Sequence, residues 1–313
     1  TFIALAYSLF SGIKASIITD FLQMLMIIVV AGILVPIIVY KAGGLSTVWS
    51  GIGGITGKYK TIFTGDSLTV AYSFGIATTV GLLSGPFGDQ SFWQRAFSIK
   101  KNELKSSFIR GALIFSVVPI LMSLLGFVIA GNGFSVADTG LVNLEAVVRY
   151  MPIGAVILFM FMLMSGLIST LDSNLCSISS LAGHDIFNMK KNNTSSSLSY
   201  SRISMLLVGA FGILIANIPG MKIVYLFLFY GTVRATTLLP TIISIFKDDV
   251  SETGVFWGIL TSFIIGLPMF TIGKIGGFTN WVVAGSLTTV LSSAIIVLLV
   301  SRMDNKKSNI ERW

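Results

Sequence analysis

The architecture of this chain depends on one stretch: Gly166-Leu167-Ile168-Ser169-Thr170-Leu171-Asp172-Ser173-Asn174-Leu175-Cys176-Ser177. It lies inside an apolar run that begins near Pro152. At 100° per residue, its small and oxygen-bearing side chains fall within about 160° of one another on a helix, and Leu, Ile, Phe and Met cover the rest. The members of this polar face are Gly166, Ser169, Thr170, Asp172, Ser173, Cys176, Ser177 and Ser180.

Asp172 is the charged residue of this polar face. A carboxylate at the centre of a membrane helix costs roughly 2.5–3.5 kcal/mol, so Asp172 needs a partner or a wet cavity, and a cation is the obvious candidate. Small residues and hydroxyls are also explained by close helix packing and by hydroxyls that bond back to carbonyls. Packing does not explain the carboxylate, which therefore indicates a function.

The composition places the chain among polytopic membrane proteins. It is 54% hydrophobic and only 11% charged, with a mean hydropathy of +0.88, whereas soluble domains contain about 25% charged residues. The single Cys excludes an internal disulfide, and the single His excludes a histidine-cluster metal site. The net charge of +8 follows membrane topology and does not indicate nucleic-acid binding.

Apolar runs long enough to cross a bilayer, about 20 residues each, predict an all-α integral membrane bundle forming one transmembrane domain over residues 1–313. The predicted spans are 15–40, 67–84, 107–130, 152–187, 203–218, 223–246, 254–272 and 280–301. The opening run Thr1–Phe10 has no initiator Met and no signal-peptide pattern, which favours the tail of another helix and a fragment of a longer protein.

The distribution of Lys and Arg predicts the orientation. The side that carries the C-terminus holds most of these residues, among them Arg95, Lys100, Lys101, Lys105 and Arg202. The positive-inside rule places that side, and the C-terminus, in the cytoplasm of a multi-pass protein of the cell membrane. On the opposite side, residues 141–150 predict a surface helix with an i,i+4 pair of Glu145 and Arg149.

Three more charged residues lie in or near spans. Asp20, with Thr19 and Gln23, forms either an interfacial patch in contact with water or a patch that faces protein or a cavity. Asp89 follows the run Gly81–Gly88, whose glycines and Pro86 either open the helix ladder and free carbonyls for binding or simply end the helix.

Arg234 lies in the middle of the span 223–246. An arginine at this depth needs an anion. The anion is either a protein carboxylate such as Asp89, in a structural ion pair, or the solute itself, in which case Arg234 belongs to a solute pocket.

The sequence resembles the sodium:solute symporter family in three motifs that, with the helix spacing, span essentially the whole chain. They are Gly12, Ala15, Thr19, Asp20 and Gln23; Gln90, Gln94 and Arg95; and Ser169, Thr170, Leu171, Asp172 and Ser173. The resemblance implies an inverted-repeat core of the leucine-transporter type, from which the first four core helices are missing here.

The resemblance also implies site residues. The common sodium site would use the Gly166 carbonyl and the hydroxyls of Ser169 and Thr170, and an additional sodium site would use Asp20, Ser169, Asp172 and Ser173. Asp172 departs from the Ser or Thr that relatives carry, which would strengthen a hard-cation site or couple it to protons. The solute site would include Asp89, Gln90 and Arg234.

These implications predict a sodium-coupled symporter that moves a small polar organic solute across the bilayer by alternating access. Its partners would be the solute, Na⁺ as coupling ion and lipid, with no cofactor and no nucleic acid. A membrane solute sensor and a passive channel are alternatives. An enzyme is not expected, because no nucleophile, metal set or acid–base pair occurs in a pocket-like context.

Overall fold

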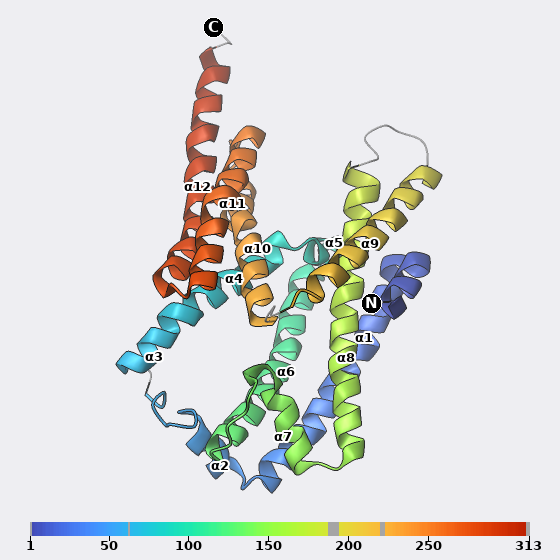
Figure 1. Ribbon diagram of the computed structural model, residues 1–313. Coiled ribbons are helices and arrows are strands. Elements are labelled where there is room, and N and C mark those ends of the chain that lie inside the picture. The colour runs from blue at the N-terminus through green and yellow to red at the C-terminus, as the bar shows by residue number, and fades with distance from the viewer. Residues whose placement is uncertain (1, 62, 187–193, 220–222, 311–313) are drawn as a thin grey trace. The chain divides into compact units, whose positions relative to one another are not determined.

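The computed structural model describes residues 2–61, 63–186, 194–219 and 223–310. Every secondary-structure element in these ranges is a helix, as Figure 1 shows. A helix satisfies its own backbone N–H and C=O groups, which a bilayer cannot do. The predicted all-α class is confirmed.

The chain forms two compact units, Thr1–Ile62 with Gln94–Pro219 and Phe63–Trp93 with Gly220–Trp313, called unit 1 and unit 2 below. Helix α5 (Gln90–Ser98) begins in unit 2 and continues into unit 1. The other helices of unit 1 are α1 (Phe2–Lys41), α2 (Leu45–Gly51), α6 (Leu104–Gly131), the 3₁₀ turn η2 (Thr139–Leu141), α7 (Val142–Tyr150), α8 (Ile153–Ser180), the π-helical turn η3 (Leu181–Ile186) and α9 (Thr194–Ala216).

Unit 1 is built on α1, which packs along α8 and also contacts α6 and α7. Its apolar core joins the second half of α1 to these helices through side chains that water does not reach, such as Ile38, Leu125, Val147 and Phe159. The predicted surface helix at residues 141–150 is present as η2 and α7, and Arg149 pairs with Glu145 at 2.7 Å.

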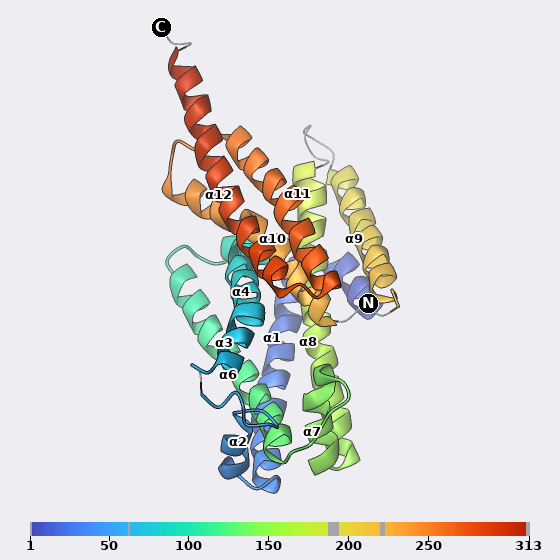
Figure 2. The same ribbon diagram turned by 60° about the vertical axis from the view of Figure 1, so that its left-hand side comes forward.

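Unit 2 contains the π-helical turn η1 (Ala71–Gly75) and the helices α3 (Gly65–Val70), α4 (Ile76–Gly88), α10 (Ile223–Phe246), α11 (Glu252–Gly276) and α12 (Thr279–Ile310). Figures 1 and 2 both show α11 and α12 side by side, connected by a short turn at Gly277. Small residues allow this close approach. A Cβ atom on Gly266, for example, would lie 2.4 Å from Thr289 Cγ2.

Among the described residues, 8 helical segments are long and apolar enough to cross a membrane, and each overlaps a predicted span. They are Lys14–Lys41, Gly65–Gly88, Leu104–Gly131, Ile153–Gly183, Leu198–Ala216, Ile223–Phe246, Glu252–Gly276 and Thr279–Asp304. The last predicted residue of the span 152–187, Phe187, lies outside the described residues. Large apolar side chains such as Phe115 and Leu214 stay more than 60% exposed, as expected of surfaces that contact lipid.

The structure overturns one expectation and decides between two alternatives at another place. The opening run is not a separate helix tail, since α1 is helical without a break from Phe2 to Lys41. The ladder also does not open within Gly81–Gly88: α4 continues to Gly88 and ends where Asp89 adopts an extended conformation. Pro86 lies in the last turn, where its missing N–H removes only one hydrogen bond. Of the two predicted alternatives, the simple helix end is the observed one.

Candidate functional site

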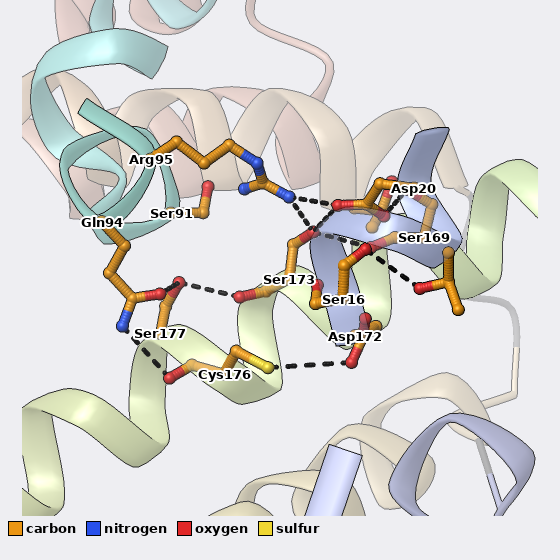
Figure 3. A network of polar contacts seen from close by, with 12 residues as sticks. Ser16, Asp20, Ser91, Gln94, Arg95, Ser169, Asp172, Ser173, Cys176 and Ser177 are labelled. Atoms are coloured by element: carbon orange, nitrogen blue, oxygen red, sulfur yellow. Dashed lines mark hydrogen bonds and ion pairs between the residues drawn. The ribbon is translucent and has the colours of Figure 1, made fainter. Parts of the chain in front are cut away.

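The polar face of α8 meets α1 and α5 in unit 1 at what we call the carboxylate cluster: Asp20, Arg95, Ser169, Asp172 and Ser173. Ser169 Oγ donates a hydrogen bond to Asp20 Oδ1 at 2.5 Å. Arg95 Nη2 donates to Asp20 Oδ2 at 2.5 Å and to Ser173 Oγ at 2.6 Å. Figure 3 shows the side chains of Ser169, Arg95 and Ser173 converging on the Asp20 carboxylate. Asp20, 18% exposed, therefore faces protein, as one of the two predicted alternatives required.

Asp172 occupies the buried side of the same cluster and is 0% exposed. Its Oδ1 accepts a hydrogen bond from Cys176 Sγ, one helical turn further along α8, at 3.8 Å. In Figure 3 the Asp172 carboxylate is turned toward Cys176, whereas the Asp20 carboxylate is turned toward Arg95. The two carboxylates thus belong to one network but have different environments, one ionic and one beside a thiol.

The oxygens predicted for the common sodium site lie on the neighbouring part of α8. The Thr170 hydroxyl, which is exposed, donates to the Gly166 carbonyl at 3.1 Å. The Ser169 hydroxyl belongs to the carboxylate cluster through its bond to Asp20. The polar face of α8 is therefore buried along Asp172 and Ser177 and open at Thr170.

Two residues next to each other on α5 join this helix to α8, although the sequence predicted no site role for either. Arg95 was expected only as one of the charges on the C-terminal side of the membrane, and the structure shows it paired with Asp20. The Gln94 amide uses both ends: Nε2 donates to the Cys176 carbonyl, and Oε1 accepts from Ser177 Oγ, each at 3.3 Å. The sequence does contain these two residues as part of a family motif, but the motif does not predict which side chains they contact.

A second group of polar side chains lies in unit 2 between α4 and α10, and we call it the arginine cluster: Asp89, Tyr230 and Arg234. Tyr230 donates its hydroxyl to Asp89 Oδ2 at 3.0 Å, and Arg234 Nη1 lies 3.7 Å from the same oxygen. The Arg234 guanidinium carbon lies 4.1 Å from the centroid of the Tyr230 ring, a cation–π geometry. Asp89 is further held by the hydroxyl of Ser91 at 2.7 Å.

Glycines make room for this cluster. A Cβ atom on Gly85 would lie 3.0 Å from Arg234 Nη1, and one on Gly88 would lie 2.6 Å from Thr237 Oγ1. Within the described ranges, Arg234 Nε and Thr78 Oγ1 are buried without a hydrogen-bond partner. Both residues line a cavity of about 10 Å³ between α4 and α10.

The third predicted solute residue, Gln90, begins α5 and is half-buried. Within the described part of the chain, its side chain makes no hydrogen bond to Asp89 or Arg234. The structure thus brings Asp89 and Arg234 together and leaves Gln90 beside them. In the described residues there is also no group of three or more His, Cys, Asp or Glu side chains arranged to hold a metal ion.

Apolar membrane helices that bring carboxylates and hydroxyls together, as α1 and α8 do, are typical of membrane transporters. Comparison with known proteins identifies the family. The profile of the sodium:solute symporter family matches residues 1–262, so the chain belongs to that family. Its fold is shared with a solved Na⁺-coupled sialic acid symporter in a substrate-bound outward-open state. That match has a TM-score of 0.68 and 20% identity and covers 96% of this chain and 65% of the other.

Three curated proteins that the chain resembles are urea transporters by name. The chain is 22% identical to the urea-proton symporter DUR3 of Oryza sativa subsp. japonica over 79% of its length and 36% of the relative. It is 23% identical to the urea active transporter of Saccharomyces cerevisiae, over 78% of its length and 37% of the relative. It is 25% identical to the probable urea active transporter 1 of Schizosaccharomyces pombe, over 98% of its length and 52% of the relative.

These matches confirm the resemblance seen in the motifs and the predicted leucine-transporter-type fold. The family and these relatives are transporters, not enzymes, and the chain is a multi-pass membrane protein. The chain spans between 36% and 52% of the length of these relatives.

Proposed function

We propose that the protein is a sodium-coupled symporter that moves a small polar solute by alternating access, with the cation bound at the carboxylate cluster. The observation that carries this proposal is the convergence of Ser169 and Ser173 on the Asp20 carboxylate beside the buried Asp172. Hard cations prefer carboxylate, hydroxyl and carbonyl oxygens. Side chains on α1 and α8 supply such oxygens within two helices that are long and apolar enough to cross a membrane, where an ionisable residue points to a functional site.

The common sodium site is the second part of the proposal. Its ligands on this chain would be the Gly166 carbonyl and the hydroxyls of Ser169 and Thr170. The 3.1 Å separation of Thr170 Oγ1 and the Gly166 oxygen supports it, because both oxygens already lie together on one turn of α8. Ser169 would then contribute to both cation sites, so occupancy of one site would influence the other.

Asp172 raises the question of which cation is coupled. The structural neighbour is described as Na⁺-coupled and the rice relative as a proton symporter. Asp172 is fully buried and its Oδ1 accepts a hydrogen bond from the Cys176 thiol, so it is the residue at which proton coupling is to be tested. We assign sodium to the Asp20 side of the cluster and treat proton coupling at Asp172 as the alternative.

We further propose that the arginine cluster binds the solute. A small neutral solute with both N–H donors and a carbonyl acceptor could donate to Asp89 and accept from Arg234, whose buried Nε has no partner among the described residues. Urea has this chemistry, and the three relatives are named for it. The cavity of about 10 Å³ beside Arg234 is the size of one water molecule, so solute entry requires side chains or helices to move.

The test is uptake of labelled urea by the full-length protein in proteoliposomes. An inward Na⁺ gradient should drive accumulation above the external concentration, and collapse of that gradient should remove it. Ser169→Ala, Thr170→Ala and Asp20→Asn should each raise the half-saturating Na⁺ concentration by roughly tenfold, while Arg202→Gln, an exposed change on α9, should not. Uptake that only equilibrates urea would identify a channel and contradict the proposal.

Uptake measurements in the same proteoliposomes also identify the coupling ion. Accumulation driven by a pH gradient without Na⁺, and lost in Asp172→Asn, would assign the proton as the coupling ion instead.

We also propose the cell membrane as the location and the cytoplasm as the side of the C-terminus. A protease-site tag at the C-terminus, cleaved only after the membrane is permeabilised from outside, would agree with that orientation.

A further inference from the structure

Arg95 places a positive charge on the oxygens that the proposed sodium site would use. Its Nη2 atom lies 2.5 Å from Asp20 Oδ2 and 2.6 Å from Ser173 Oγ. A hard cation bound by these oxygens would sit at about the same distance from them, 2.3–2.6 Å. The guanidinium nitrogen and an ion would therefore compete for the same two oxygens, and we infer that the two are not bound there together.

Charge leads to the same conclusion. The guanidinium and an alkali ion are both cations, and their repulsion is strong where water is scarce. Asp20, by contrast, needs one positive charge at all times, because a carboxylate inside a membrane protein is costly unless it is paired. Either Arg95 or the ion meets that need.

We propose that Arg95 is a tethered cation that changes places with Na⁺ at Asp20 and Ser173. When Na⁺ binds, the guanidinium leaves the two oxygens; when Na⁺ leaves, the guanidinium returns and neutralises Asp20. The carrier can then reorient without an ion and without an unpaired buried carboxylate. This inference rests on the proposed cation site and adds to it the residue that replaces the ion during the return step.

The position of Arg95 suits such an exchange. Its side chain is 36% exposed, so the guanidinium has a route into water on a long, flexible stem. The preceding residue, Gln94, is bound to α8 through the Cys176 carbonyl and the Ser177 hydroxyl. Gln94 can hold the backbone of α5 on α8 while the side chain of Arg95 moves.

The experiment separates transport steps that need an empty carrier from steps that do not. Urea exchange at equal Na⁺ on both sides uses only the loaded carrier, whereas net uptake also requires the empty carrier to return. Both are measured in proteoliposomes for the unmodified protein, Arg95→Gln and Arg95→Lys. The control is Arg149→Gln, which removes another carboxylate-paired arginine, bound to Glu145 at 2.7 Å on α7.

Arg95→Gln should keep urea exchange within about twofold and lower net uptake by roughly tenfold, because only the return step loses its cation. Its half-saturating Na⁺ concentration for exchange should fall by roughly tenfold, since the competitor is gone. Arg95→Lys should recover part of the net uptake, and Arg149→Gln should match the unmodified protein. Retained exchange also shows that the variant is folded.

Equal losses of exchange and net uptake in Arg95→Gln, with unchanged Na⁺ dependence, would overturn the inference and leave Arg95 as a structural link. Coupling of the unmodified protein to protons alone would overturn it too, while a cation-coupled symporter would remain. If the unmodified protein shows no cation-dependent uptake, the proposed function fails and the inference fails with it.

Discussion

Gly81 of α4 faces Gly231 of α10 so closely that a Cβ atom on Gly81 would lie 3.0 Å from the Gly231 Cα atom. This backbone contact sets the separation of the two helices. One turn further along both helices, the guanidinium of Arg234 lies against Gly85 and reaches Asp89. Helix packing and the geometry of the arginine cluster are therefore parts of one interface within unit 2.

Gly81→Ala should destabilise unit 2, because the added methyl group pushes α4 away from α10. Overpacking of this kind costs about 1–3 kcal/mol, and it should lower the thermal unfolding midpoint measured in detergent. Gly111→Ala on α6 is the matched control, since a Cβ atom there would meet nothing within 4 Å. Equal midpoints for the two variants would contradict this packing.

Gly266→Ala should disrupt the pair of α11 and α12 in the same way. The new Cβ atom would lie 2.4 Å from Thr289 Cγ2 and 2.8 Å from the Thr289 backbone nitrogen, so the two helices must separate, at a cost of about 1–3 kcal/mol. Thermal unfolding followed by intrinsic fluorescence measures the effect. Gly212→Ala on α9, where the new Cβ atom would have open space, should leave the midpoint unchanged or raise it.

Gln94→Leu should weaken the attachment of α5 to α8. The change removes the donor to the Cys176 carbonyl and the acceptor from Ser177, and two such bonds contribute about 1–2 kcal/mol in total. Hydrogen exchange of the α5 amides, read by mass spectrometry, should become faster. Ser98→Ala, which loses a hydroxyl bond to the Gln94 carbonyl within α5, should change exchange little.

Arg234→Gln should raise the KM for urea by roughly tenfold or more, because the change removes the positive donor group of the proposed solute site. Arg234→Lys should keep the charge but lose the planar contact with the Tyr230 ring. Its KM should lie between that of the unmodified protein and that of Arg234→Gln. Initial rates of urea uptake provide the measurement, with the exposed Arg202→Gln as control. Unchanged KM and uptake in Arg234→Gln would exclude Arg234 from the solute site and leave a structural ion pair with Asp89.

The candidate sites were predictable in part. The pattern of the polar face on α8 indicated a role for Ser169, Asp172 and Ser173. A polar patch on the first span singled out Asp20, to which the resemblance gave a role in a sodium site, and Asp20 does hydrogen-bond with Ser169. Arg95 was missed because its sequence position, close to Lys100, Lys101 and Lys105, agrees equally well with a solvated charge. The glycines of α4 were compatible with an opened helix or with a simple helix end; the helix ends at Gly88, and its glycines provide space for α10 and for Arg234.

The sequence by itself determined the class of protein, the membrane spans and the residues too polar to face lipid. The spans and the polar residues follow mainly from local composition, because a bilayer-spanning segment needs about 20 apolar residues and a helix satisfies its own backbone, and the class follows from the motifs. Only the tertiary structure decided which charges meet. The pairs Asp20 with Arg95 and Asp89 with Arg234 join segments far apart in the chain. Such pairs depend on how each helix is rotated and on which turn faces its neighbour, and packing between helices sets both.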